Sequence, residues 1–247
     1  MFLRIIVFYV LTWFFLILLG GIQQTTGLLP PEIGLAQWGP GIAALLMLVL
    51  FRKDGHKITF FSNDIAIMRY VYAALIPVGI GLIIFLIRSF ISIEPSEDAP
   101  TYGSLLLLVL WMPFGAIGEE LGWRGYLHKK LATRTRMRGF FSSLLVGVLW
   151  MPIHVTFLTQ GPVFILLLTL LIISYSIVIY ALVQDTGFNV LLASIFHLSI
   201  NLTNLLFLDV IYETSFMMIN TIVWAIVAAM TVLMKRDVFF APKNYSS

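Results

Sequence analysis

The chain has 247 residues, of which 60% are hydrophobic and only 11% are charged. Soluble globular domains carry about 25% charged residues, so this composition excludes a soluble enzyme and indicates an integral membrane protein. The complete absence of cysteine excludes disulfides, thiolate metal ligands and a cysteine nucleophile.

Apolar stretches long enough to cross a bilayer recur along the chain. A spanning helix needs about 20 mostly apolar residues. We therefore predict an all-α fold, a polytopic bundle of about eight transmembrane helices that forms one integral membrane domain over residues 1–247. The predicted spans are Arg4–Gly21, Leu35–Phe51, Arg69–Phe90, Leu105–Leu127, Phe140–Leu158, Val163–Val183, Phe188–Leu208 and Phe216–Met234.

The charges outside the spans sort by sign. Thirteen of the 15 Lys and Arg residues lie at Arg4, Arg52–Arg69, Lys129–Arg138 and Lys235–Lys243, all on one side of an eight-span arrangement. The positive-inside rule then places both termini in the cytoplasm. We predict that the protein lies in the cell membrane of a prokaryote. We predict that the basic run Lys129–Arg138 contacts anionic lipid and not nucleic acid. The opposite side holds Glu32, Glu94, Glu97, Asp98, Asp209 and Glu213.

The fourth span carries three charges, Glu119, Glu120 and Arg124, although each costs about 3 kcal/mol in the hydrocarbon region. Glu120 and Arg124 are four residues apart, so they share a helix face and can pair. Glu119 lies about 100° further round the helix and is left free to act as a general base. Small residues beside the carboxylates predict close helix contacts: Gly118, Gly122 and Gly125.

Two further spans carry histidines. In the fifth, His154 follows Pro152, which removes a helix hydrogen bond and is expected to kink the helix there. In the seventh, His197 and Asn201 are four residues apart, an arrangement that offers two donors to one developing oxyanion.

Each group also has a purely structural interpretation. The Glu120–Arg124 pair can be an interfacial ion pair, His154 a packing residue, and His197 with Asn201 a cross-link between helices. We expect Asn204 to be a packing residue, and His56 and His128, which lie in basic loops, to be solvated.

The three groups together resemble a known family. Glu119–Arg124 fits the motif Glu-Glu-x-x-x-Arg, Trp150–His154 fits Phe-x-x-x-His with Trp in place of Phe, and His197–Asn201 fits His-x-x-x-Asn. In this order the motifs are similar to those of the CAAX prenyl protease and bacteriocin-processing (CPBP, or Abi) intramembrane endopeptidases. The resemblance covers residues of about 105 to 205.

The resemblance implies an endopeptidase whose site lies within the membrane. It implies that Glu119 and His154 activate a water, that His197 and Asn201 hold the oxyanion, and that the Glu120–Arg124 pair fixes the geometry. The expected partners are membrane lipid and a peptide or lipidated-protein substrate, with no nucleic acid.

Metal dependence stays open at this point. The family has also been classed as metal-dependent, in which case Glu119, His154 and His197 would be zinc ligands. No His-Glu-x-x-His helix is present. We favour a glutamate-type mechanism without a cofactor.

The alternative is a non-catalytic membrane protein on the same scaffold, either a transporter or an immunity or regulatory protein. Transporters usually consist of two similar halves with interrupted helices. Here the charged cluster is confined to the fourth to seventh spans. An inactive relative is expected to lack a motif residue, and none is missing.

Overall fold

The computed structural model describes residues 2–27, 29–30, 32–62, 64–97, 103–135 and 137–241. These residues form helices and connecting segments and contain no strand, so the all-α prediction is confirmed. Asp98, Arg136 and Lys243, which belong to the predicted charge pattern, lie outside the described residues.

Sixteen helical elements follow one another along the described chain; five of them are short 3₁₀ turns and one, η3, is a π-helical segment of eight residues. In order they are α1 (Phe2–Thr26), η1 (Leu35–Trp38), α2 (Gly39–Leu50), η2 (Arg52–Asp54), α3 (Ile67–Ser89), α4 (Leu105–Glu120), η3 (Leu121–His128), α5 (Lys129–Arg134), α6 (Gly139–Trp150), η4 (Met151–Ile153), η5 (Val155–Phe157), α7 (Pro162–Val183), α8 (Val190–Asn204), η6 (Leu205–Phe207), α9 (Thr214–Met234) and α10 (Arg236–Phe240).

Within the described residues, six helices are long and apolar enough to cross a membrane. Two shorter apolar helices, Leu35–Leu50 and Gly139–Ile153, occupy the second and fifth predicted spans. The polytopic membrane bundle is thereby confirmed, while the count of eight spans stays a prediction. The six long helices are Phe2–Thr26, Ile67–Ser89, Leu105–Arg134, Pro162–Val183, Val190–Phe207 and Thr214–Met234.

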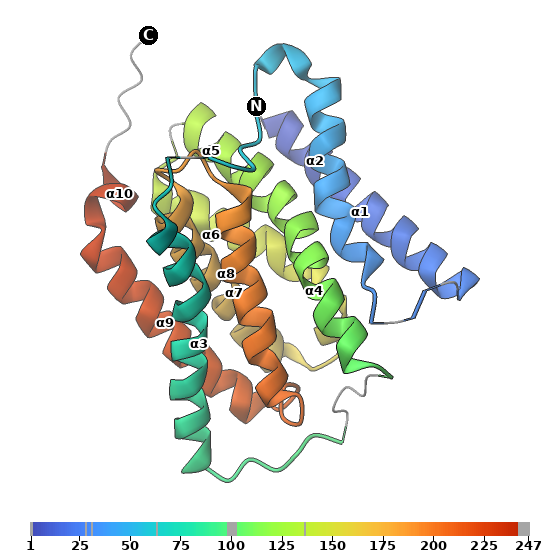
Figure 1. The fold of residues 1–247 in the computed structure, drawn as a ribbon, viewed down its shortest axis with the longest axis vertical. Helices are drawn as coiled ribbons and strands as arrows, with labels where there is room; N and C mark the ends of the chain where they lie inside the picture. The colour runs from blue at the N-terminus through green and yellow to red at the C-terminus, as the bar shows by residue number, and fades with distance from the viewer. Residues whose placement is uncertain are drawn as a thin grey trace.

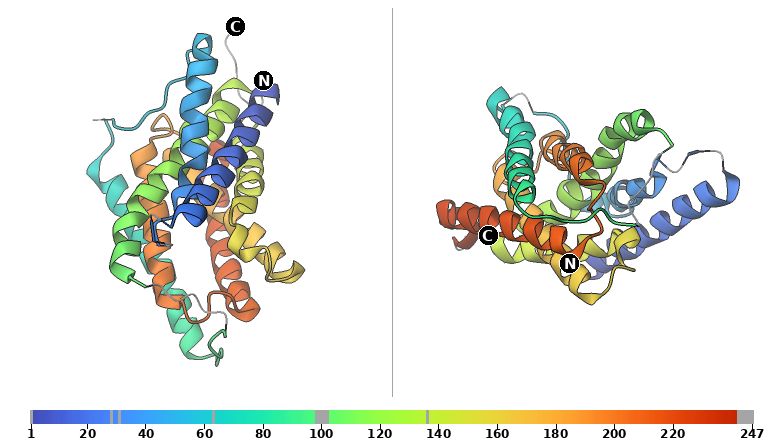
Figure 2. Two further views of the ribbon diagram at one scale, coloured as in Figure 1. Left: turned by 90° about the vertical axis from the view of Figure 1, so that its right-hand side faces the viewer. Right: turned by 90° about the horizontal axis from the view of Figure 1, so that it is seen from below.

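The bundle is centred on α7 and α8 (Figure 1). Helix α7 packs between α6 and α9, and α8 packs against α3 and α4. Helices α1 and α2 pack on each other and extend from one side of the bundle, as the view from below shows (Figure 2). The outward faces of α1, α3 and α9 expose large apolar side chains such as Ile17, Leu86 and Ile226, which suits a lipid environment.

Three of the four basic clusters meet at one end of the molecule. Arg4 and Lys130 both pair with Asp54, and the Lys130 Nζ group lies 2.8 Å from its carboxylate. The hydrogen bond from Lys130 holds the pKa of Asp54 below its usual value. Lys130 is 2% exposed, so the prediction that the whole Lys129–Arg138 run lies on lipid was wrong for this residue.

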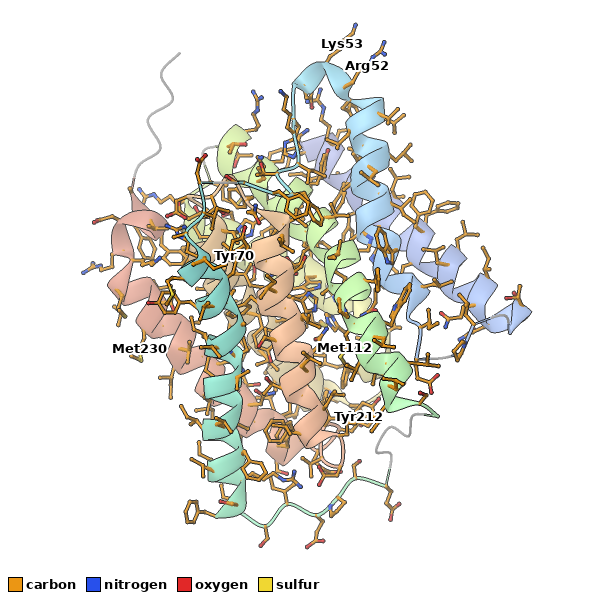
Figure 3. The ribbon with its side chains drawn as sticks, viewed as in Figure 1. Arg52, Lys53, Tyr70, Met112, Tyr212 and Met230 are labelled. Atoms are coloured by element: carbon orange, nitrogen blue, oxygen red, sulfur yellow. The ribbon has the colours of Figure 1, made fainter. Side chains whose placement is uncertain are left out.

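The first residues of α1 and helix α10 lie at this same end (Figure 1), as do Arg52 and Lys53 (Figure 3).

An ion pair between Arg88 and Asp209 connects the end of α3 to the segment after α8. The cytoplasmic orientation of the basic end stays a prediction.

Glycines let α2 approach the charged helix closely. A Cβ atom added at Gly41 would lie 2.6 Å from the Gly118 carbonyl oxygen, and one added at Gly122 would lie 2.4 Å from Pro40. No larger residue fits at these positions without a shift, which agrees with the close contacts predicted around Gly118 and Gly122.

The two histidines predicted to be solvated are not. His128 is fully buried, stacks on Tyr180 with ring centroids 4.9 Å apart, and hydrogen-bonds to Ser142. His56 is half-buried, and its Nε2 atom lies 3.0 Å from the Gly125 carbonyl oxygen. Burial lowers the pKa of His56. The loop prediction failed for His128 because the helix that carries the carboxylates continues through it as far as Arg134. His56 does lie in a loop, but that loop packs against Gly125 and Tyr126.

Candidate active site

The three intramembrane charges lie where α4 passes into η3, a π-helical segment. π-Helical turns are rare and occur frequently at functional sites. Glu120 and Arg124 are fully buried and Glu119 is 4% exposed. The Arg124 Nη1 group donates a hydrogen bond to Glu120 Oε1 at 2.8 Å, so the predicted pair is present.

The same carboxylate oxygen also binds a histidine. His197 Nδ1 lies 2.9 Å from Glu120 Oε1, which brings α8 onto the charged helix. Because a carboxylate only accepts, Nδ1 carries the hydrogen and Nε2 is the nitrogen left for other partners. The sequence predicted Glu120 only as the partner of Arg124. It missed this contact because the two residues are 77 positions apart.

Glu119 is bonded at both of its oxygens. The Trp150 indole Nε1–H donates to Oε2 at 2.7 Å, and the Gln37 amide Nε2 lies 3.5 Å from Oε1. A carboxylate has about four lone-pair positions, so two remain for a water. Sequence reasoning missed Gln37, although a polar side chain inside the predicted span Leu35–Phe51 was a signal.

His154 lies at a break in the chain. Helix α6 ends at Trp150, and His154 stands between the single turns η4 and η5. The predicted kink at Pro152 is thus a helix end, and the span predicted as Phe140–Leu158 is shorter. His154 Nδ1 lies 3.2 Å from the Met151 carbonyl oxygen. A carbonyl only accepts, so Nδ1 is the donor and Nε2 is left as an acceptor.

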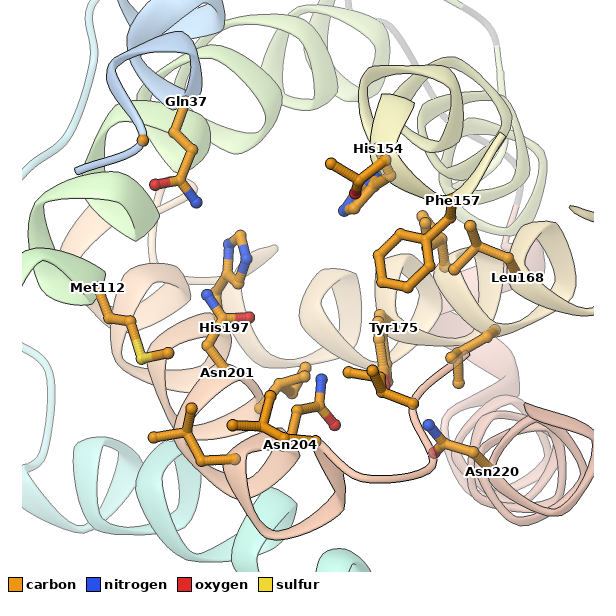
Figure 4. Close-up of a pocket in the computed structure, with 18 of the residues that line it drawn as sticks. Gln37, Met112, His154, Phe157, Leu168, Tyr175, His197, Asn201, Asn204 and Asn220 are labelled. Carbon is orange, nitrogen blue, oxygen red and sulfur yellow. The ribbon is translucent and has the colours of Figure 1, made fainter. Parts of the chain in front are cut away.

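A cavity of about 420 Å³ is lined by three of the four predicted catalytic residues, His154, His197 and Asn201. Figure 4 shows His197 and Asn201 pointing into it from α8, with His154 across the space. Asn204, expected to be a packing residue, also lines the cavity. Glu119 lies beside the wall, held by Trp150 and Gln37, which are both lining residues. The polar lining consists of Glu32, Gln37, His154, Thr156, His197, Asn201, Asn204 and Asn220.

The far wall of the cavity is apolar, as Phe157 and Leu168 show in Figure 4. A pocket that joins an apolar wall to a few convergent polar groups is the usual form of a small-molecule or peptide site. Its size lies in the range of about 300–1,000 Å³ that such sites occupy.

The described residues of the site do not form a cluster of metal ligands. Among the described side chains, no three His, Asp or Glu groups are placed to hold one ion. We therefore derive no step through a metal.

The fold and the site define a polytopic membrane protein with a buried site of carboxylate, imidazole and amide groups. Residues 101–203 match the sequence model of the Rce1-like family, the type II CAAX prenyl endopeptidases. The matched segment contains all three motifs. The predicted resemblance to the CPBP endopeptidases is confirmed over this segment, and at family level it supports CAAX-protease-like intramembrane proteolysis.

Curated relatives extend the similarity beyond this segment. The lysostaphin resistance protein A of two Staphylococcus epidermidis strains is 28% identical in an alignment of 204 residues, which covers 79% of this chain. The alignment covers 52% of each relative, so the chain spans about half the length of these proteins.

Proposed function

We propose that this chain is an intramembrane endopeptidase that hydrolyses a peptide bond near or within the membrane, in the manner of a CAAX prenyl protease. The observation that carries the proposal is the cavity at which His154, His197 and Asn201 converge beside Glu119. The match of residues 101–203 to a peptidase family supports it.

In this proposal Glu119 is the general base. It takes a proton from a water whose oxygen attacks the scissile carbonyl, and it later returns that proton to the leaving amine. His154 offers Nε2 as an acceptor that orients the same water, because its Nδ1–H is bonded to Met151. No metal is part of this scheme.

His197 and Asn201 hold the oxyanion in the proposal. With Nδ1–H bonded to Glu120, His197 can donate from Nε2 only as an imidazolium. Charge balance favours that form. Glu119 and Glu120 carry two negative charges and Arg124 one positive, so a protonated His197 makes the buried group neutral.

The substrate we propose is a peptide or a lipidated protein, reached from the lipid or from the cytoplasmic side of a prokaryotic cell membrane. A second candidate, a non-catalytic resistance or regulatory protein, is favoured by one observation. The curated relatives are named for lysostaphin resistance and not for a peptidase activity.

One experiment separates the two candidates. Protein purified in detergent is incubated with a farnesylated CAAX peptide and with the same peptide carrying an unmodified cysteine, and the products are identified by mass spectrometry. Cleavage by the wild type that is lost in Glu119→Ala supports the peptidase. Equal cleavage by both proteins would show a contaminant, and a folded wild type that cleaves neither peptide contradicts the CAAX-like proposal.

The same assay tests metal dependence. We expect a chelator such as 1,10-phenanthroline to leave the rate unchanged, since no described cluster holds an ion. Loss of activity that added zinc restores would contradict the metal-free scheme.

A further inference from the structure

The second motif departs from its family at Trp150, where Phe is usual. The indole Nε1–H of this residue donates to Glu119 Oε2 at 2.7 Å, the shorter of the two hydrogen bonds that the carboxylate receives. A phenylalanine ring has no donor and cannot make this bond. The departure therefore adds an interaction at the group proposed as general base.

The indole ring contacts the rest of the charged group as well. It lies over the Arg124 guanidinium, with Cζ 4.1 Å from the ring centroid, a cation–π geometry. The His197 and His154 rings approach it edge-on, with centroids 5.2 Å and 5.8 Å away. Trp150 is 2% exposed. One buried side chain thus contacts groups from all three motifs.

The position of Trp150 in the chain explains how it reaches them. It is the last residue of α6, and the chain leaves the helix directly after it towards His154. From the end of α6, the indole contacts Arg124 on the charged helix and His197 on α8.

We propose that Trp150 is a positioning residue that holds the Glu119 carboxylate in its reactive orientation through the indole N–H. The inference rests on the proposed peptidase function and adds a residue to its machinery. Trp150 touches neither the water nor the substrate in this scheme. It fixes one carboxylate oxygen, so that the remaining lone pairs of Glu119 face the water.

The test compares Trp150→Phe with Trp123→Phe. Trp123 is also fully buried, its indole N–H has no hydrogen-bond partner among the described residues, and its ring packs against Phe8. Both changes remove one buried indole N–H and keep an aromatic ring. Both variants therefore lose stability through a smaller aromatic ring, and only Trp150→Phe removes a hydrogen bond to Glu119.

Cleavage of the peptide by each purified protein gives kcat and KM separately. We expect Trp150→Phe to lower kcat by roughly 10- to 100-fold, the range for losing a hydrogen bond to a charged group, with KM changed less than about two-fold. Trp123→Phe should retain both constants within about two-fold. A wild-type kcat in Trp150→Phe, or an equal loss in Trp123→Phe, would overturn the inference.

A second readout needs no substrate. Protein labelled with 5-fluorotryptophan gives ¹⁹F signals, and the Trp150 signal is the one that Trp150→Phe removes. We expect Glu119→Ala to move that signal and to leave the Trp123 signal in place. An unmoved Trp150 signal overturns the inference whatever the activity. A moved signal in a protein that cleaves nothing leaves the contact standing and counts against the peptidase function alone.

Discussion

The tripeptide Trp-Met-Pro occurs twice, within α4 at Trp111–Pro113 and at the end of α6 at Trp150–Pro152, with different structural results. Helix α4 continues through Pro113 for seven more residues as far as Glu120, because η1, α2 and α8 pack around it. Helix α6 ends at Trp150, and the chain turns through η4 and η5 to enter α7. A proline removes one helix hydrogen bond in either place. The packing around each segment decides whether the helix continues past the proline.

The indole side chains of the two copies also differ in their contacts. Trp111 stacks on Phe114, and its buried N–H has no partner among the described residues. Trp150 donates to Glu119. Four residues after each tryptophan, the first copy has Gly115 and the second has His154. Both tryptophans line the same cavity, so the comparison shows that identical local sequence acquires different chemistry from its neighbours.

The largest effect is expected at His154. His154→Ala removes the imidazole proposed to orient the water, so peptide cleavage should fall below detection while the protein elutes as a folded monodisperse species. Glu119→Ala and His197→Ala should behave alike. The measurement is product formation together with size-exclusion elution in detergent. Retained cleavage by His154→Ala would contradict the proposed role of His154, and the segment after Trp150 would then have only a structural role, like the segment after Trp111.

The second-largest effect is expected at Asn201 on α8, which lines the same cavity as Trp111 and Trp150. Asn201→Ala removes one oxyanion donor and should lower kcat by about 10²- to 10³-fold. Asn201→Asp is the matched variant, because it keeps the shape of the side chain but places a negative charge at the oxyanion. It should be at least as inactive, and a kcat near wild type in either variant would exclude the oxyanion role.

The Glu120–Arg124 pair beneath the Trp150 ring should respond in stability. Removing one partner of a buried ion pair strands the other, at a cost of about 3–5 kcal/mol. We expect Glu120→Ala and Arg124→Ala to lower yield and the thermal unfolding temperature in detergent. Arg69→Ala is the control, because its pair with Asp185 is about 40% exposed and should contribute far less. Equal losses in all three would show that burial of the pair does not matter.

The smallest effect is expected at Gly115, the counterpart of His154. A Cβ atom there would lie 2.1 Å from Gln37 Oε1, so Gly115→Ala should push the amide away from Glu119. The 3.5 Å contact is weaker than the indole bond, and we expect kcat to fall about ten-fold or less. Gly79→Ala, where a Cβ meets nothing within 4 Å, is the matched control. An unchanged kcat in Gly115→Ala would leave Trp150 as the one effective restraint on Glu119.

Local rules of the chain predicted much of this protein. Apolar length predicted the helical membrane bundle, and the four-residue spacing of Glu120 and Arg124 predicted their ion pair. These features depend on helix geometry and on the cost of charge in lipid, which act over a few residues. The grouping of basic clusters at one end also followed, since alternating spans return every second loop to the same side.

Only the tertiary structure decided which partner each polar group received. Glu119 meets Gln37 and Trp150 across 82 and 31 positions, and Glu120 meets His197 across 77. His128 appeared to lie in a basic loop and is fully buried, because η3 and α5 extend the helix and α6 and α7 cover it. Hydrogen bonds within a bundle depend on which helix faces which. That choice is made by packing between segments far apart in the chain, and no local pattern carries it.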